Sequence, residues 1–247
     1  MNARLFVSDR LGNGPDLRLA GEKAHYVGRV LRLKVGDALH VFNGDDGEWR
    51  ATVAAMTRDS VLLEVGTEVA VATESPLRVH LVQGVSRGER MDFVVQKATE
   101  LGVKRITPVF TDHGVVKLDA QRSAKRREHW QRIAESACEQ SGRVRPPLVD
   151  APLPLNDWFG AGYAADSVQL VLTPDARAAL TAVALPRPKL CLLVGPEGGF
   201  SERERADAGA AGFSAVALGP RILRTESAAL AAVAVAQALW GDLGRVP

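Results

Sequence analysis

The chain lacks most features of a secreted, membrane-bound or metal-stabilised protein. Cys138 and Cys191 are its only cysteines in 247 residues, too few for a disulfide framework or a zinc knuckle. We expect both to be buried, reduced thiols. No apolar stretch approaches the length that crosses a bilayer, and the first residues lack a basic start followed by a long apolar run. We therefore expect a cytoplasmic protein with no membrane partner and no metal site.

Common phosphate-binding motifs are missing as well. Neither G-x-G-x-x-G nor G-x-x-x-x-G-K-[ST] occurs in the glycine loops of this chain. The net charge of +2 does not argue for or against nucleic acid, because RNA-binding surfaces are usually local patches. Hydrophobic residues make up 46% of the chain, enough for the cores of one large or two modest domains.

The most informative stretch is residues 190–229. Two apolar runs, Leu190–Val194 and Ala215–Leu218, each break into a glycine-proline loop and then into a helix-like segment. The first loop, residues 195–200, carries three glycines, which let a ligand approach the backbone without meeting a Cβ. Ser201 then predicts a helix N-cap with a glutamate three residues later, the pattern of a capping box.

The second loop, residues 219–224, places Ile222 and Leu223 where a polar surface connection would be usual. Thr225 predicts the N-cap of the next helix. Residues 228–240 are almost all small and apolar, so this helix should be buried on every side. Two such loops before a buried helix predict a ligand site at the carboxyl ends of parallel strands. The alternative is that the loops only join strands to helices.

GPEGGF and LGPRILRTESA together resemble the signature pair of the RsmE family, methyltransferases that act on N3 of a uridine in small-subunit ribosomal RNA, within the SPOUT superfamily. The similarity continues through residues 87–103, 138–143 and 25–37, so it covers nearly the whole chain. It implies S-adenosyl-L-methionine as the methyl donor and a deep trefoil knot at about residues 190–240. It also implies a homodimer formed through the C-terminal domain.

The spacing of apolar residues predicts two domains, a small N-terminal β barrel and a C-terminal α/β domain. Residues 1–72 read as short strands around one helix, a small β barrel that the resemblance makes a PUA-like RNA-binding domain. Residues 73–247 alternate strands with helices, which predicts a mostly parallel sheet, here the SPOUT methyltransferase domain. The expected strands are 5–7, 17–19, 38–42, 49–54, 61–65, 79–82, 106–110, 168–172, 190–194 and 215–218, and the expected helices are 22–31, 89–101, 123–140 and 228–240.

The implied donor pocket combines aliphatic side chains, which suit the flat faces of adenine, with loops whose backbone can come close to a ligand. Its residues are Leu172, Thr173, Val194, Gly195, Pro196, Glu197, Gly198, Leu218, Gly219, Ile222 and Leu223.

Methyl transfer to uridine N3 requires loss of the imide proton and in-line placement of the nitrogen. Arg224 is the first candidate to stabilise the uracil oxygens, because a guanidinium is a rigid fork of donors. Glu197 or Glu226 could accept the proton or only offset the sulfonium charge. Glu226 could equally be a first-turn residue that complements the helix dipole.

Basic residues spread along the chain are candidates to contact 16S ribosomal RNA, since arginine suits both phosphates and base edges. They are Arg10, His25, Arg29, Arg32, Lys34, Arg87 and Arg143. Lys97, Glu100, Glu139 and Gln140 also match family positions, but they could as easily form a structural ion-pair network.

Other functions remain open at this point. A non-enzymatic RNA-binding or ribosome-assembly protein would keep the same loops without turnover, and a nucleotide-linked oxidoreductase is disfavoured by the missing dinucleotide fingerprint. The apolar helix at 228–240 bears on assembly: it offers Gln237 as its main polar residue, so a partner should cover its second side, most simply in a symmetric dimer.

Overall fold

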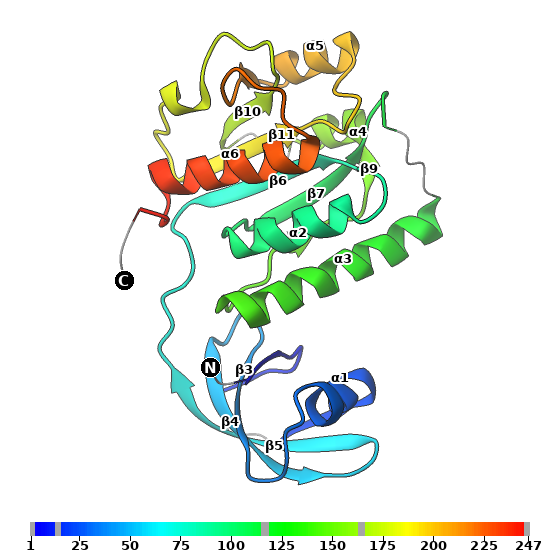
Figure 1. Cartoon of the computed structure of the whole chain (residues 1–247), viewed down its shortest axis with the longest axis vertical. Helices are drawn as coiled ribbons and strands as arrows, with labels where there is room; N and C mark the ends of the chain where they lie inside the picture. The colour runs from blue at the N-terminus through cyan, green and yellow to red at the C-terminus, as the bar shows by residue number, and fades with distance from the viewer. Residues whose placement is uncertain (1–2, 13–15, 115–118, 163–165, 245–247) are drawn as a thin grey trace. The chain divides into compact units, whose positions relative to one another are not determined.

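The computed structural model describes residues 3–12, 16–114, 119–162 and 166–244. The chain forms two compact units, each drawn in Figure 1. Unit 1 contains residues 1–74 and 138–146, and unit 2 contains residues 75–137 and 147–247. Because each unit is built from two segments, no single cut near residue 72 separates them.

Residues 138–146 belong to unit 1, where they are bonded by Arg4, a residue with an 11% exposed side chain. The Arg4 guanidinium donates to the carbonyls of Cys138 at 2.6 Å and Arg143 at 3.0 Å. Its charge is balanced by Glu48, which is 4% exposed and lies 2.5 Å away. Phe42 packs on Cys138 in the same small buried cluster. A buried guanidinium is stable only when it is paired and hydrogen-bonded, so these contacts hold the segment in place.

Unit 1 is built on a five-stranded sheet in the order β1-β3-β4-β5-β2. Its strands are β1 (Ala3–Phe6), β2 (Asp16–Ala20), β3 (Ala38–Phe42), β4 (Glu48–Met56) and β5 (Ser60–Val69). β1 pairs with β3 in parallel and the other pairs are antiparallel. Register shifts between β4 and β5 curl the sheet around an aliphatic core. Helix α1 (Gly21–His25) and the π-helical turn η1 (Tyr26–Val30) replace the single helix expected at 22–31.

β3 and β4 pair in antiparallel register and are joined by a hairpin turn at residues 43–47. Asn43 shapes it, because its side-chain oxygen accepts hydrogen bonds from the backbone N–H groups of Asp45 and Asp46 at 3.0 and 2.8 Å. This is the local turn that asparagine favours.

Unit 2 contains a fully parallel sheet in the order β12-β10-β11-β6-β7-β8, with β9 also paired to β7, which confirms the expected α/β class. Its strands are β6 (Arg78–Gly84), β7 (Arg105–Phe110), β8 (Leu148–Val149), β9 (Leu153–Pro154), β10 (Val168–Leu172), β11 (Lys189–Val194) and β12 (Ser214–Val216). Its helices are α2 (Arg90–Glu100), α3 (Ala120–Ser141, the last turn of which counts with unit 1), α4 (Leu155–Gly160), α5 (Glu202–Ala210) and α6 (Thr225–Trp240), with a 3₁₀ turn η2 (Leu180–Ala182).

Helices cover both faces of this sheet. α2 and α6 lie side by side on one face, where Val95, Ala98 and Val233 join the larger core (Figure 1). α4 and α5 cover the other face, where Trp158 and Cys191 are fully buried. Both cysteines are buried free thiols, as expected. Burial also raises the pKa of the Cys191 thiol. No helix in the described ranges combines the length and apolar character needed to cross a membrane.

Helix α6 corrects two expectations. Its N-cap is Arg224 rather than Thr225, whose hydroxyl is engaged elsewhere. The helix is also buried on one face only: Val233 is 0% exposed, whereas Leu239 is 46% exposed. Gln237 does not lie on the solvent-facing side of α6, because it is fully buried and accepts a hydrogen bond from the Ser75 hydroxyl. Within this chain, α6 therefore keeps an apolar face that is only partly covered.

A histidine sits in a polar cluster at the middle of the sheet. His80 lies 2.7 Å from the Thr107 hydroxyl, which donates to Asp150, and Arg105 donates to the same carboxylate at 2.7 Å. Trp158 meets the His80 ring edge-on at 5.8 Å. Burial and the Arg105 charge lower the pKa of His80 to about 4, although Asp150 acts in the opposite direction. His80 is therefore neutral in the folded protein at pH 7.

This cluster predicts acid sensitivity. The unfolded chain protonates His80 near its ordinary pKa of 6.5, whereas the folded chain does so only near 4, so the unfolded state is favoured as pH falls between these values. The free energy of unfolding should drop by about 3 kcal/mol over that window. Urea unfolding at pH 7 and pH 4.5 checks this. His80→Gln should lack most of the drop, and an equal drop in both proteins would contradict the assignment.

Candidate active site

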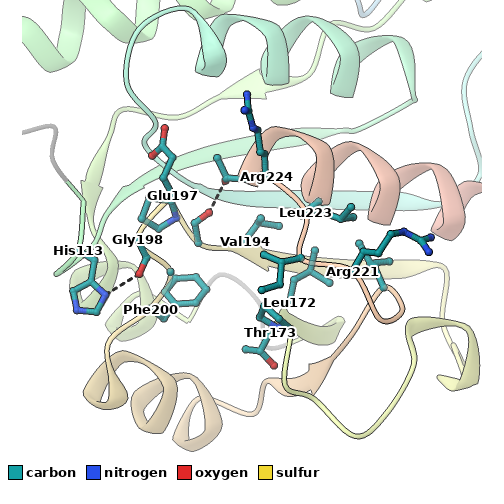
Figure 2. Close-up of a pocket in the computed structure, with 18 of the residues that line it drawn as sticks. His113, Leu172, Thr173, Val194, Glu197, Gly198, Phe200, Arg221, Leu223 and Arg224 are labelled. Atoms are coloured by element: carbon teal, nitrogen blue, oxygen red, sulfur yellow. Dashed lines mark hydrogen bonds between the residues drawn. The ribbon is translucent and has the colours of Figure 1, made fainter.

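A cavity of about 790 Å³ opens at the carboxyl ends of β10, β11 and β12 (Figure 2). The structure brings all eleven residues of the predicted donor pocket to its lining. It adds residues that sequence reasoning missed: Arg90, His113, Phe200, Arg205, Arg221 and Thr225. Leu172 and Val194 come directly from strand ends, so the apolar part of the lining continues the sheet core.

Close packing fixes the first glycine loop. A Cβ on Gly84, at the end of β6, would lie 2.5 Å from the Pro196 nitrogen, so the loop rests directly on that strand. A Cβ on Gly195 would lie 3.2 Å from the Phe200 ring. Only Gly199 in this loop has a left-handed backbone, with φ of +66°. Gly195 is thus required for space rather than for its backbone angle.

The loop between β7 and α3 clamps the same glycine loop from outside. The predicted capping box is confirmed: Ser201 and Glu204 exchange side-chain and backbone hydrogen bonds at the start of α5. Glu204 is 2% exposed and also accepts from the Asp112 N–H at 2.8 Å. A His113 ring nitrogen bonds the Gly198 carbonyl at 3.0 Å (Figure 2). Nothing in the local sequence predicts this clamp, because its halves are more than eighty residues apart.

The second loop runs along the mouth of the cavity. Gly219 has a left-handed φ of +101°, so this position needs glycine. Ile222 is 85% exposed and Leu223 37% exposed, and both reach the lining. Ile222 therefore lines the cavity at its rim, with most of its side chain in solvent.

One hydroxyl joins the two loops. Thr225 donates to the Gly195 carbonyl at 2.5 Å and accepts from the Gln83 amide at 2.8 Å. Gln83 is 0% exposed. These bonds link the end of β6, the first loop and the start of α6. In the sequence, the one sign of this contact is Gln83, a glutamine inside the apolar run of β6. A polar side chain in such a run implies a buried hydrogen-bond partner.

The charge around the mouth is mainly positive. Arg90, Arg205, Arg221 and Arg224 line the cavity, and Glu197 is the one acidic side chain among the lining residues that the structure describes. Within the described chain, Arg221 and Arg224 form no hydrogen bond or ion pair through their guanidinium groups. Figure 2 shows both side chains pointing away from the loops that carry them. They are available for an anionic ligand.

Glu197 is held in place by the loop after β6 and by the first residue of α2. The Arg90 guanidinium lies 2.5 Å from its carboxylate, and the two side chains are 43% and 31% exposed. Burial alone would raise the pKa of Glu197, but bonds from its own N–H, from Arg90 and from the Arg87 N–H lower it below the usual value. Ion pairs this exposed contribute only about 0.2–1 kcal/mol, so Arg90 can exchange its partner at little cost.

Glu226, the other candidate carboxylate, does not reach the cavity lining. It stands in the first turn of α6, next to Thr225. Its Oε2 atom is buried without a hydrogen-bond partner in the described part of the chain. No group of three metal-ligating side chains occurs among the described residues.

The candidate RNA contacts separate into two groups. Most are exposed, as an RNA contact must be: Arg10, His25, Arg29, Arg32 and Lys34 on unit 1, and Arg87 in the loop after β6 on unit 2.

Arg143 is the exception and is corrected. It is 2% exposed, and its guanidinium bonds Glu74 at 3.0 Å, so it stabilises unit 1 and does not offer its charge to RNA.

The undecided family positions have structural partners. Lys97 and Glu100 pair at 2.8 Å within α2, and the Glu139 carboxylate accepts from the Phe6 N–H at 2.9 Å. The structure assigns no comparable contact to Gln140, which stays undecided.

Comparison with known proteins extends these observations. Residues 73–237 match the RNA methyltransferase domain family, and residues 19–66 match the RNA methyltransferase PUA domain family. Ribosomal RNA small subunit methyltransferase E of Buchnera aphidicola from Schizaphis graminum is 34% identical over 97% of each chain.

Two solved structures are similar over the same extent. A putative methyltransferase of Legionella pneumophila, in complex with S-adenosylmethionine, is 38% identical with a TM-score of 0.93, covering 98% of this chain and all of that one. Ribosomal RNA small subunit methyltransferase E of Neisseria gonorrhoeae, bound to S-adenosylmethionine, is 36% identical with a TM-score of 0.92, covering 98% and 99%. Family models, curated relatives and solved structures thus agree along nearly the whole chain, which belongs to the RsmE family of ribosomal RNA small subunit methyltransferases.

Proposed function

We propose that this chain transfers a methyl group from S-adenosyl-L-methionine to N3 of a uridine in the 16S ribosomal RNA of the small subunit. One observation carries the proposal: a cavity with an apolar floor and a glycine rim lies at the strand ends of a parallel sheet, and the unpaired Arg224 stands at its edge. The names of the relatives support the same activity, and the two similar structures contain the donor.

The cavity suits this donor. Its volume of about 790 Å³ falls in the range of small-molecule sites. Leu172, Val194 and Leu218 offer an apolar surface for adenine, and the bare backbone at Gly195 allows the close approach that a side chain would block. When bound, S-adenosylmethionine supplies an electrophilic methyl group on a positively charged sulfur.

Arg224 and Glu197 have different roles in the proposed methyl transfer. We propose that Arg224 binds the uracil oxygens and stabilises the negative charge that develops as N3 loses its proton. Glu197 has a lowered pKa, which makes it a poor proton acceptor at neutral pH but keeps it negatively charged. We therefore propose that Glu197 balances the positive charge in the cavity rather than taking the proton. Glu226 lies outside the cavity lining, so we assign it no part in the proton transfer.

We propose further that unit 1 is a PUA-like β barrel that binds RNA through Arg10, His25, Arg29, Arg32 and Lys34. Its curled sheet and the exposure of these residues support this. We assign unit 2 to the SPOUT class, with a deep trefoil knot at about residues 190–240. The hydroxyl of Thr225, bonded to the loop at Gly195, supports such an interlocking of the two loops. A ribosomal substrate would place the protein in the cytoplasm.

The partly covered face of α6 supports a homodimer formed through unit 2. Leu239, in the last turn of this apolar helix, is 46% exposed, and Leu243, just after the helix, is 54% exposed. A symmetric interface would remove these side chains from water, and dimers are the commonest closed assemblies. Burial within the monomer, the competing interpretation, does not account for the exposed end of the helix.

Nucleoside analysis tests the activity directly. A 16S ribosomal RNA transcript incubated with the protein and methyl-labelled S-adenosylmethionine should yield labelled N3-methyluridine by mass spectrometry. Titration calorimetry with S-adenosylmethionine and with NAD separates the alternatives. RNA binding without donor binding would favour an assembly protein, and NAD binding would favour an oxidoreductase.

A first variant tests the pocket. Gly195→Val should abolish donor binding, because the added carbons would enter the space of Phe200 and Gly199, 3.2 and 3.3 Å from the first added atom. Gly209→Val is the control, since a Cβ there meets nothing within 4 Å. Calorimetry measures the dissociation constants. Unchanged affinity in a folded Gly195→Val protein would place the donor elsewhere.

A second variant tests Arg224. Removing a donor that acts on developing charge typically lowers turnover by about a hundredfold or more, so Arg224→Ala should do this with nearly intact donor affinity. Arg221→Ala removes an equally unpaired arginine from the same rim and should cost much less. Single-turnover rates and donor affinities are compared. Equal losses of binding and rate in Arg224→Ala would indicate a structural role.

A further inference from the structure

The Arg90–Glu197 pair stands between two ligands of opposite charge, if the proposed function holds. The donor carries a net positive charge, from its sulfonium and amino groups against one carboxylate. RNA is a polyanion, and the mouth of the cavity offers it the arginines 90, 205, 221 and 224. Arg90 differs from Arg221 and Arg224 because it is already engaged, with the carboxylate of Glu197 at 2.5 Å.

Arg90 can leave this ion pair while the Glu197 carboxylate stays in position. Glu197 is held by the backbone N–H groups of Arg87 and of Glu197 itself, which fix the carboxylate without neutralising its charge. The Arg90 side chain is 43% exposed at the start of α2, and among the described residues its guanidinium bonds Glu197 alone. A phosphate accepts the two parallel bonds of a guanidinium as a carboxylate does and carries its own charge. An exposed pair of this kind is weak enough to be exchanged.

We propose that Arg90 is a phosphate-responsive latch: it masks the charge of Glu197 in the free protein, and an RNA phosphate takes over its guanidinium, leaving the Glu197 carboxylate in place and unmasked in the cavity. RNA binding then strengthens the attraction of the cavity for a cationic donor. The coupling is reciprocal, so bound donor also strengthens RNA binding. Arg90 is in this sense a positioning residue that acts through Glu197.

The coupling is measurable with two donor analogues that cannot transfer a methyl group. Sinefungin carries a positively charged amine where the donor has its sulfonium, and S-adenosylhomocysteine has a neutral sulfur there. Calorimetry at constant ionic strength gives the affinity of each with and without a 16S ribosomal RNA transcript. RNA should tighten sinefungin binding about three- to fivefold, the size expected for unmasking one exposed charge, and S-adenosylhomocysteine binding much less.

Variants identify the residues responsible. Arg90→Gln should bind sinefungin three- to fivefold more tightly than wild type without RNA, and RNA should add nothing further. Glu197→Gln should bind sinefungin more weakly and also lose the RNA effect. Arg90→Lys keeps the positive charge and should retain part of the RNA effect on sinefungin binding. Arg221→Gln and Arg29→Gln are matched controls: both remove an exposed arginine and should weaken RNA binding without changing the coupling.

The possible outcomes distinguish a failure of the latch proposal from a failure of the proposed methyltransferase function. If neither analogue binds, the proposed donor site is wrong and the latch falls with it. If both bind but RNA tightens them equally, or Arg90→Gln keeps the RNA effect, the site stands and the latch is wrong. Loss of coupling in Arg221→Gln as well would also overturn it, because the effect would then come from the general positive charge of the rim.

Discussion

The hydroxyl of Thr225 is the contact on which the geometry of the cavity depends. It donates to the Gly195 carbonyl and accepts from Gln83, a residue 142 positions earlier in the chain. Gln83 is fully buried, so leaving its amide unsatisfied would cost about 1–3 kcal/mol. The hydroxyl therefore locks the first glycine loop to the start of α6, and the spacing of the two loops follows from it. The apolar floor beneath them is set independently by the sheet.

The arginines of this chain fall into two groups, structural ones with permanent partners and exposed ones without partners. Arg4 and Arg143, whose side chains are 11% and 3% exposed, are hydrogen-bonded and ion-paired in unit 1, where they hold residues 138–146. Arg221 and Arg224 are exposed and unpaired at the cavity mouth. Burial makes the first pair structural, because a desolvated guanidinium is stable only with permanent partners. Exposure leaves the second pair free to bind a ligand, which is why the same residue type serves both purposes in one chain.

The sequence predicted local features well and distant contacts poorly. Most of the strands and the capping box of Ser201 and Glu204 follow from patterns within a few residues, but β8 and β9 were not predicted. The lining of the cavity came from the family resemblance. Gly84, Arg90 and His113 were missed because each acts on a loop that is far away in the chain. Thr225 was assigned as an N-cap because threonine before an apolar run favours one, but its tertiary partners captured the hydroxyl.

Matching a family motif does not by itself say what a residue does. CEQSGR contains Glu139 and Arg143, which the resemblance offered as candidates for RNA or ion-pair roles, and both are used within unit 1. LGPRILRTESA contains Arg221 and Arg224, which are exposed, and Thr225, which is buried. Side-chain solvation decides between these roles: a charge that has lost its water must already be paired, and only a solvated charge can be given a new partner by a ligand.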